Sequence, residues 1–424
     1  DEIDLDGFTK LSINNMLSEL DPYTTYMEKE ERSGIELLTK GKYGGIGIQI
    51  GKRDGILTII SPMENSPAKK AGILAGDKII KNDDQDALTM SMDEAAKLIR
   101  GKRGTKIKIT IERFGLDEPV QYSLVRQDIK VKDVSYFGVL ENEVGYIRLT
   151  RFSKNSADEV RSSIKKLMQN DISGLIFDLR DNPGGLLSNA IDILDMFIEK
   201  DQLLVSTKGK TNRSSRTYKS RREPIVPKDL KIVILINKGS ASASEIISGV
   251  FQDLDRGIVI GRDSFGKGLV QTVYNINKAS SIKITTAKYY LPSGRLIQKD
   301  GYLPDEILPD SLPKDSIFNT LSGRTVISGA GITPDHIVNI KPISPILSAC
   351  LRSGAFFSFV QKNKHMYKQF SDVESDQFLL NKFEKYVIDS DLDIKLKGES
   401  NYSNFRKSLM ILDSTNISIQ SALD

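Results

Sequence analysis

The sequence predicts a multidomain α/β protein, for three reasons. The chain has 424 residues, which at roughly 100–200 residues per domain means more than one domain. Hydrophobic residues make up 39% of the chain, which is enough to fill several cores. In the middle of the chain, apolar strands alternate with glycine-containing turns and amphipathic helices, the pattern of an α/β core.

This core is expected to occupy residues 128–345. Its clearest elements are a helix over about 156–168 and strands at 144–149, 174–179 and 231–236. The second of these strands leads into the turn Asn182-Pro183-Gly184-Gly185, and the third into the small-residue run GSASASE at 239–245. In sheets of this kind, functional sites form where strands end and helices begin.

The regions on either side of the core differ from it. Residues 1–42 are expected to form a helical arm that is closed by Asp21 and Pro22. Residues 43–127 contain short strands and a helix near 91–100, whose Ser91 and Glu94 have the spacing of a capping box. Residues 346–424 are expected to form a charged helical accessory region.

Composition argues against several classes of protein. The net charge is only +4, and the densest basic stretch, residues 208–222, is better explained as a solvated loop or hairpin than as a nucleic-acid-binding surface. No apolar run reaches ~18 residues, so no membrane-spanning helix is expected. The single cysteine, Cys350, excludes an internal disulfide. The sequence starts at Asp1 without a methionine, so any leader would lie outside it.

The segment at 239–245 offers serine hydroxyls without a nearby histidine. The only two histidines, His336 and His365, both follow it in the sequence. A serine hydroxyl is a poor nucleophile until a base removes its proton. Lys267, which follows Ser242 by 25 residues, is the expected substitute, as in the Ser-Lys variants of the catalytic triad. The sequence therefore predicts a serine hydrolase with a lysine base.

Spacing alone does not choose among Ser240, Ser242 and Ser244, because any of them could instead cap the helix that follows. A serine at a helix N-terminus has free backbone N–H groups beside it, which stabilise an oxyanion. The glycines at 184 and 185 could bring further N–H groups to the same cleft. An ordinary strand-to-helix turn is the alternative.

Lys267 can act as a base only when its amine is neutral, which requires apolar surroundings. Phe265, Leu269 and Val270 could provide these walls. If the stretch is extended, Gln271 lies on the same face and could orient the amine. An exposed turn residue is the alternative for a lysine between glycines.

A phosphate-binding loop can be set aside. Residues 261–267 have the spacing of such a loop, but Gly268 follows where the loop needs Ser or Thr. A strand is also expected after it, instead of a helix whose N-terminus faces the phosphates.

Residues 43–127 resemble a PDZ domain. The resemblance rests on a glycine turn before a strand and on the pattern SPA, AGI, GDKI within residues 66–79. Consecutive N–H groups in such a turn can bind a terminal carboxylate, while an extended peptide pairs with the adjacent strand edge. The residues expected to bind a substrate C-terminus are Gly44, Gly45, Ile46, Gly47 and Ile48.

From about residue 10 to 340, the chain resembles the carboxyl-terminal processing peptidases, also called tail-specific proteases. Several independent motifs occur in family order: LDPYTTY at 20–26, the PDZ pattern, DLRDNPGG at 178–185, GSASASE at 239–245, FGKGLVQ at 265–271, YYLPSGR at 289–295 and GITPD at 331–335. Leu291 stands where the family more often has threonine. The last ~80 residues fall outside the resemblance.

The resemblance implies a role for each candidate residue. Ser242 would be the nucleophile, Lys267 the general base and Gln271 the residue that holds the base. The oxyanion hole would consist of backbone N–H groups, one from Ala243 and one from Gly184 or Gly185.

The resemblance also implies a crotonase-like (ClpP/crotonase-type) α/β protease core with an inserted PDZ domain. Members of the family are usually exported to the periplasm or cell envelope, and they cleave proteins near apolar, unstructured C-termini; no cofactor or metal is expected for this chain. In some relatives an arginine near the end of the last PDZ helix gates the site. Arg100 is the candidate here, and the alternative is a solvated cation at a helix end. The two helical regions could pair protomers into a homo-oligomer.

Two other functions fit parts of the sequence. A catalytically silent PDZ adaptor would bind C-terminal peptides without cutting them, but the intact Ser242, Lys267 and Gln271 argue against it. A crotonase-like acyl-CoA enzyme would have a similar oxyanion hole but would lack the Ser/Lys pair.

Overall fold

The computed structural model describes residues 4–28, 38–39, 41–53, 55–277, 280–299, 316–339 and 343–390. The chain divides into two compact units. The first unit comprises Asp1–Tyr43 and Lys130–Asn339, and the second comprises Gly44–Ile129 and Ile340–Asp424. Residues 29–37 of the expected N-terminal arm and residues 391–424 of the expected C-terminal region lie outside the described residues.

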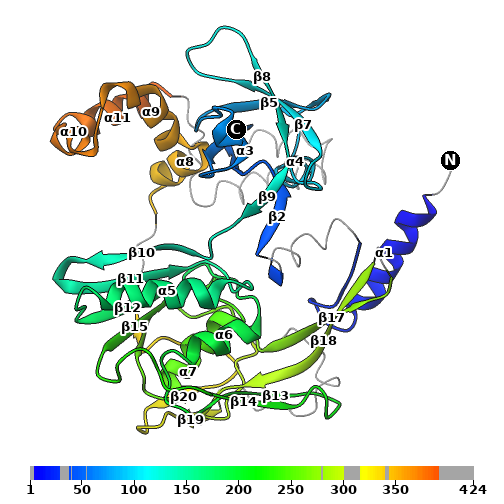
Figure 1. Cartoon of the computed structure of the whole chain (residues 1–424), viewed down its shortest axis with the longest axis vertical. Coiled ribbons are helices and arrows are strands. Elements are labelled where there is room, and N and C mark those ends of the chain that lie inside the picture. The colour runs from blue at the N-terminus through cyan, green and yellow to red at the C-terminus, as the bar shows by residue number, and fades with distance from the viewer. Residues whose placement is uncertain are drawn as a thin grey trace, which may run out of the picture. The chain divides into compact units, whose positions relative to one another are not determined.

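A six-stranded sheet forms the centre of the first unit (Figure 1). In spatial order its strands are β10 (Val134–Leu140), β11 (Val144–Leu149), β12 (Gly174–Asp178), β15 (Lys231–Ile236), β16 (Ile258–Gly261) and β21 (His336–Ile337). All neighbours from β11 to β21 are parallel, and β10 is antiparallel to β11. The strands predicted at 144–149 and 231–236 are confirmed to the residue, and the strand predicted at 174–179 ends one residue earlier.

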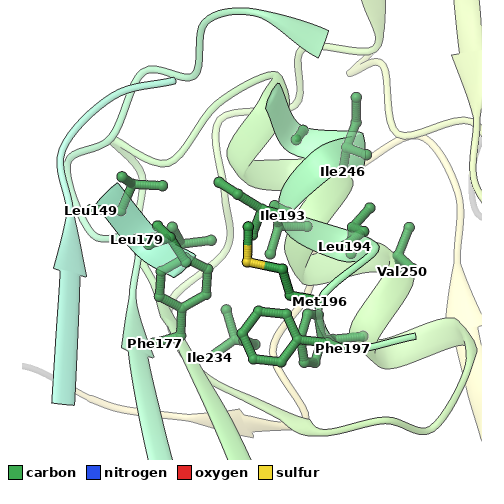
Figure 2. Close-up of a cluster of buried hydrophobic side chains, with 14 of the residues drawn as sticks. Leu149, Phe177, Leu179, Ile193, Leu194, Met196, Phe197, Ile234, Ile246 and Val250 are labelled. Atoms are coloured by element: carbon green, nitrogen blue, oxygen red, sulfur yellow. The ribbon is translucent and has the colours of Figure 1, made fainter. Parts of the chain in front are cut away.

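Three helices connect these strands and fill the core of the unit. They are α5 (Ser156–Met168), α6 (Leu187–Leu194) and α7 (Ala243–Asp253). Helix α5 packs on β10 and β11, α7 packs on β15 and β16, and α6 contacts both other helices. Figure 2 shows Phe177 of β12 and Ile234 of β15 facing Ile193 and Leu194 of α6 and Val250 of α7. Apolar burial of this extent is the main favourable term in folding.

A second sheet of the same unit includes the N-terminal part of the chain. Its strands are β1 (Thr25–Met27), β18 (Ser281–Tyr290), β13 (Leu203–Lys208) and β14 (Arg216–Lys219), with β17 (Leu269–Asn275) also paired to β18. Strands β13 and β14 form an antiparallel hairpin, which confirms the hairpin expected within the basic stretch. The N-terminal arm is only partly helical, because α1 (Leu5–Ser18) is followed by β1, which pairs with β18.

Smaller elements lie outside these two sheets. A 3₁₀ helix η1 (Glu141–Glu143) joins β10 to β11, and β19 (Ile317–Asn319) pairs with β20 (Thr325–Ile327). A separate two-stranded sheet consists of β2 (Lys42–Gly45) and β9 (Gln127–Lys130).

The segment 44–129 folds around an antiparallel sheet and two helices. The strands are β3 (Ile48–Arg53), β4 (Ile56–Pro62), β5 (Lys78–Asn82), β7 (Lys106–Glu112) and β8 (Val120–Val125), with β6 (Gln85–Asp86) paired to β5. Helix α3 (Pro67–Lys70) is capped by Ser66, and α4 (Met92–Ile99) by Ser91. Ser91 and Glu94 each bond the other's main-chain N–H, so the predicted capping box is confirmed. Strand β3 is an edge strand of its sheet.

The C-terminal helices belong to the same unit as this segment. They are α8 (Pro345–Ser353), α9 (Ala355–Asn363), η3 (Lys364–Met366), α10 (Phe370–Ser375) and α11 (Leu379–Ile388). The Arg53 guanidinium at the end of β3 lies 5.8 Å from the centroid of the Phe357 ring. Helices α9 and α11 pack through stacked rings, with 4.7 Å between the centroids of Phe356 and Phe383. Across the described part of the chain, the helices are too short or too polar to cross a membrane.

Candidate active site

The serine-containing segment forms the turn between β15 and α7. Ser242 directly precedes the first residue of α7 and has φ 56° and ψ −114°. A residue with a Cβ rarely adopts such angles, and the strain is about 1–3 kcal/mol. Strained residues of this kind cluster at functional sites, where the surrounding structure holds them in place.

The three serines of this turn have different surroundings. The Ser240 hydroxyl donates to the Leu179 carbonyl at 2.8 Å, and the Ser244 hydroxyl donates to the Asn182 carbonyl at 2.9 Å. Both of these serines are fully buried. Ser242 is partly exposed and forms a capping box with Glu245, and its hydroxyl donates no hydrogen bond among the described residues. Only the Ser242 hydroxyl is therefore free to react.

The turn after β12 packs directly against the serine turn. Asn182 is fully buried, and its carbonyl accepts the N–H of Ala241 at 3.0 Å. Gly184 has φ +93°, and a Cβ there would lie 2.9 Å from both the Ala243 nitrogen and the Ser242 Cβ. Only glycine satisfies both the backbone angle and the close approach.

The N–H groups of this turn differ in what they bind. The Gly184 N–H donates to the Asn182 side-chain oxygen at 2.9 Å and is therefore already used. The N–H groups of Gly185 and Ala243 have no such partner within the described ranges. Ala243 is the first residue of α7, where N–H groups lack helical partners and the helix dipole is positive.

Glu245 links the serine turn to the loop that carries Lys267. Its side chain is fully buried on the first turn of α7. One carboxylate oxygen accepts the N–H of Ser242 at 2.7 Å and the N–H of Lys267 at 2.9 Å. The other oxygen accepts the Gly266 N–H at 2.7 Å and the Ser264 hydroxyl at 2.5 Å. Burial raises the pKa of Glu245, but four donors surround the carboxylate and favour its ionised form.

Tyr289 joins the same two residues through their carbonyl groups. It lies on β18, is fully buried, and its hydroxyl contacts the carbonyl oxygens of Ser242, at 3.2 Å, and Lys267. The phenol has one proton to donate, so the two carbonyls share it. Glu245 and Tyr289 thus fix the backbones of Ser242 and Lys267 relative to each other.

The Lys267 side chain is largely shielded from water. Its amine lies 4.6 Å from the centroid of the Tyr23 ring. Burial, together with the positive charge of Lys283, lowers the pKa of Lys267 to about 8, against the opposing effects of Glu245 and Asp21. The amine is therefore neutral in a substantial fraction of molecules slightly above neutral pH.

The amine is not hydrogen-bonded to the serine in this conformation. Within the described residues, no hydrogen bond joins Lys267 Nζ to Ser242 Oγ, although their backbone nitrogens bond the same Glu245 oxygen. The Gln271 side-chain nitrogen donates to Thr285 at 3.4 Å and makes no bond to Lys267. Catalytic hydrogen bonds are often long in a substrate-free site and form only in the complex.

The residues expected to bind a substrate C-terminus lie together before the edge strand β3. Gly44 and Gly45 end β2, Ile46 is buried, and Ile48 begins β3. Gly47 has φ +74°, and a Cβ there would lie 2.4 Å from the Ser66 Cβ, so the turn requires glycine.

Arg100 occupies the C-cap of α4 in the same unit. Its side chain is exposed, and its backbone N–H donates to the Ala96 carbonyl. This position is compatible with both interpretations of Arg100, as a gate and as a cation at a helix end.

Three residues of the site were not predicted from the sequence. Glu245 was part of the serine motif without an assigned role, Tyr289 was part of YYLPSGR, and Tyr23 was part of LDPYTTY. All three residues belong to motifs that the sequence analysis found, but only the fold shows which residues of a motif approach the reactive groups. Phe265, one of the expected walls for Lys267, is 38% exposed, and the ring over the amine comes from Tyr23.

Comparison with known proteins identifies the family to which the chain belongs. The family model of Peptidase family S41 matches residues 143–308, and that of the PDZ domain matches residues 58–113. The carboxy-terminal-processing protease of Bartonella bacilliformis is 40% identical over 307 residues, which are 72% of this chain and 70% of that protein. The chain belongs to peptidase family S41.

A further relative and a solved structure also match this S41 peptidase. The carboxy-terminal processing protease CtpA of Bacillus subtilis is 37% identical over 294 residues, which are 69% of this chain and 62% of that protein. Among solved structures, a photosystem II D1 C-terminal processing protease is 25% identical, with a TM-score of 0.45, and the match covers 80% of this chain and 84% of that one.

Family membership establishes the general function. The chain is a serine-type peptidase of the carboxy-terminal-processing kind with a PDZ domain, and the alternative of a silent adaptor is not supported. The PDZ domain implies binding of peptide C-termini.

Proposed function

We propose that this S41 peptidase hydrolyses peptide bonds through an acyl-enzyme on Ser242, with Lys267 as general base. The observation that carries the proposal is the contrast among the three serines, since only Ser242 is partly exposed and has a hydroxyl that donates no hydrogen bond in the described residues. The shielded amine of Lys267, with its pKa near 8, supports the assignment of this residue as the general base.

The first chemical step is attack of Ser242 Oγ on the substrate carbonyl carbon while Lys267 Nζ accepts the hydroxyl proton. The oxyanion that forms would be stabilised by the N–H groups of Ala243 and Gly185. Of the two glycines considered, Gly185 is the better candidate, because Gly184 donates to Asn182. Loss of one such donor typically lowers the rate by ~100–1,000-fold.

Collapse of the tetrahedral intermediate breaks the carbon–nitrogen bond. The Lys267 ammonium returns its proton to the leaving amine, and the N-terminal part of the substrate stays on Ser242 as an ester. Water then attacks the ester, with Lys267 again as the base, and the serine hydroxyl is restored. Each step requires Lys267 Nζ to come within hydrogen-bond distance of the group whose proton it exchanges, which its flexible side chain allows.

Gln271 would hold the lysine amine in its reactive position, in keeping with its place in the family motif. Its carbonyl oxygen is a suitable acceptor for the amine once the side chain turns from Thr285. A crotonase-like arrangement of the core is part of the same proposal, and the alternation of parallel strands and helices supports it.

Substrates would be proteins with apolar, unstructured C-termini. Their tails would pair with the edge strand β3, and the terminal carboxylate would bind the turn from Gly44 to Ile48. We further propose, on the family resemblance, export to the periplasm or cell envelope, homo-oligomer formation, and a gating role for Arg100. The gating proposal would be wrong if Arg100→Ala cleaved a tailed substrate at the wild-type rate.

The proposed reaction can be tested with a model protein that ends in an apolar tail. Mass spectrometry should detect cleavage products with the wild-type enzyme and none with Ser242→Ala. Cleavage by the Ser242→Ala variant would contradict the nucleophile assignment. A product that forms only from thioester substrates would favour a crotonase-like acyl-CoA enzyme instead.

A further inference from the structure

The LDPYTTY motif at residues 20–26 lies more than 200 residues before Lys267 in the sequence and precedes both family-model matches. Nothing in the reaction described above uses this motif. The structure nevertheless brings one of its side chains to the reactive lysine.

The motif folds into a tight turn that the buried Asp21 side chain organises. One Asp21 oxygen accepts the N–H groups of Tyr23, at 2.8 Å, and Thr24, at 2.9 Å, and the other accepts the Thr24 hydroxyl at 2.5 Å. A carboxylate with three donors fixes the direction in which the chain leaves the turn. The orientation of Tyr23 is therefore set locally.

Two contacts hold this turn on the catalytic unit. The Thr24 hydroxyl accepts the N–H of Thr285 at 3.2 Å, and β1 pairs with residues Ser281 to Lys283 of β18. Strand β18 also pairs with β17, which begins two residues after Lys267. The turn and the lysine are thus attached to the same strand.

The Tyr23 ring lies over the amine of Lys267, 4.6 Å from the ring centroid to Nζ. An aromatic face at this distance excludes water from one side of the amine and also attracts its charged form. The other ionisable groups that act on the amine are Asp21 in the turn, Glu245 on α7 and Lys283 on β18.

We propose that Tyr23 is a positioning residue for the catalytic lysine, and that its ring covers the Lys267 amine and keeps water from it. The N-terminal turn is then part of the catalytic unit of the peptidase. This inference rests on the proposed function, in which Lys267 is the general base.

Substitutions that remove the Tyr23 ring should have a different effect from one that removes only its hydroxyl. Burial is the largest cause of the lowered pKa of Lys267, so we expect loss of the cover to outweigh loss of the ring's attraction for the charged amine and to raise the pKa toward its ordinary value. Tyr23→Ala and Tyr23→Asn should both have this effect, the second with a residue suited to turns. Tyr23→Phe, which keeps the ring, should behave like the wild type.

The first measurement is competitive acetylation of Lys267 across pH, read by mass spectrometry of the peptide that contains it. This titration reports the pKa of the amine whether or not the protein cleaves anything. We expect the midpoint to move up by about one unit in Tyr23→Ala and Tyr23→Asn, a tenfold change in the neutral fraction. Tyr26→Ala, in the same segment, is the matched control and should leave the midpoint in place.

The second measurement is the pH profile of kcat/KM on a tailed substrate. In Tyr23→Ala and Tyr23→Asn, the uncovered variants, kcat/KM should fall about tenfold at pH 7. Most of this loss should be recovered at high pH, because the lysine then deprotonates. Thermal melts would identify a variant that does not fold, and the other uncovered variant then carries the test.

The two sets of results distinguish two kinds of failure. A Lys267 midpoint that is unchanged in a folded uncovered variant overturns the role of Tyr23, whatever the protein cleaves. An equal shift in Tyr26→Ala also overturns it, because loosening of the segment would then be the cause. Absence of cleavage by the wild type instead overturns the proposed function and leaves the acetylation result to decide on Tyr23.

Discussion

Ser242 differs from its two neighbours in what its hydroxyl does. Ser240 and Ser244 use their hydroxyls to satisfy buried carbonyls of another turn, at 2.8 and 2.9 Å. They are therefore structural parts of the packing between the turns after β12 and β15. Ser242 contributes no such bond among the described residues and instead occupies a strained backbone conformation.

Alanine substitutions should separate these roles. Ser242→Ala should abolish cleavage while the free energy of unfolding changes little, since the Ser242 hydroxyl donates to no carbonyl among the described residues. Ser240→Ala and Ser244→Ala should each lower the free energy of unfolding by about 0.5–1.5 kcal/mol, because one buried hydrogen bond is lost while a backbone N–H still bonds the same carbonyl, and should keep measurable cleavage when folded. Chemical denaturation and a cleavage assay check both, and the reverse pattern would contradict the assignment.

At this scale, the sequence could predict the chemistry but only part of the geometry. The absence of histidine near the serines predicted a lysine base, and burial lowers the pKa of Lys267 as that base requires. Spacing could not choose among three serines, because the choice depends on which hydroxyls meet carbonyls from Leu179 and Asn182. The cover over the lysine could not be predicted either, since Tyr23 approaches it only through strand pairing.

Two side chains connect the elements that carry Ser242 and Lys267. Glu245 on α7 binds the N–H groups of both residues, and Tyr289 on β18 contacts both carbonyls. The start of α7 and the loop before β17 are therefore joined at two points. This arrangement offsets the strain at Ser242 and sets the distance over which the lysine must reach.

Removal of the Tyr289 hydroxyl should loosen this connection. Tyr289→Phe keeps the buried ring but leaves two carbonyls without their shared donor, so we expect kcat to fall by about tenfold with KM unchanged, and stability to fall by about 1–3 kcal/mol. Tyr274→Phe, an exposed tyrosine on β17, is the control and should change neither. A rise in KM with kcat preserved would argue against a positioning role.

The turn after β12, which contains Gly184, packs closely against the turn after β15, which contains Ser242. Gly184→Ala should lower both stability and activity severely, because its Cβ would lie 2.6 Å from the Ala241 carbonyl oxygen and 2.9 Å from the Ala243 nitrogen. Gly115→Ala is a matched control, since Gly115 has a similar φ of +87° but open space around its Cβ. If both substitutions had equal effects in a thermal melt, backbone strain alone would explain them.

Most elements could be predicted because local signals and burial agree. The helix at 156–168 has its apolar residues at helical spacing, and strands such as β15 alternate buried and less buried positions. The pairing of β1 with β18 could not be predicted, because it joins residues that are more than 250 positions apart and the strand has three residues. Such a short strand has no periodicity to detect.

At the scale of the whole molecule, the C-terminal helices group with the PDZ segment in one unit. Arg53 of β3 contacts the ring of Phe357, and a Cβ on Gly76 would lie 2.7 Å from the Gln361 side chain. The sequence predicted a helical accessory region but could not predict what it packs against, since exposed and buried aromatic residues look alike in a charged helical segment.

Phe357→Ala should therefore affect the PDZ unit and leave the peptidase core unchanged. We expect faster amide hydrogen exchange in β3 and in the loop around Gly76, because an aromatic contact and apolar burial are lost. Exchange in β12 and β15 should match the wild type. Increased exchange in β12 and β15, with β3 unaffected, would contradict this grouping.

The base assignment is tested most directly by the pH dependence of kcat/KM for cleavage of a tailed substrate. The account predicts that kcat/KM rises with pH through an apparent pKa near 8, because the Lys267 amine must lose its proton before it can accept one from Ser242. A rise centred near 6.5, the ordinary pKa of a histidine, or no change between pH 6 and 10, would contradict it.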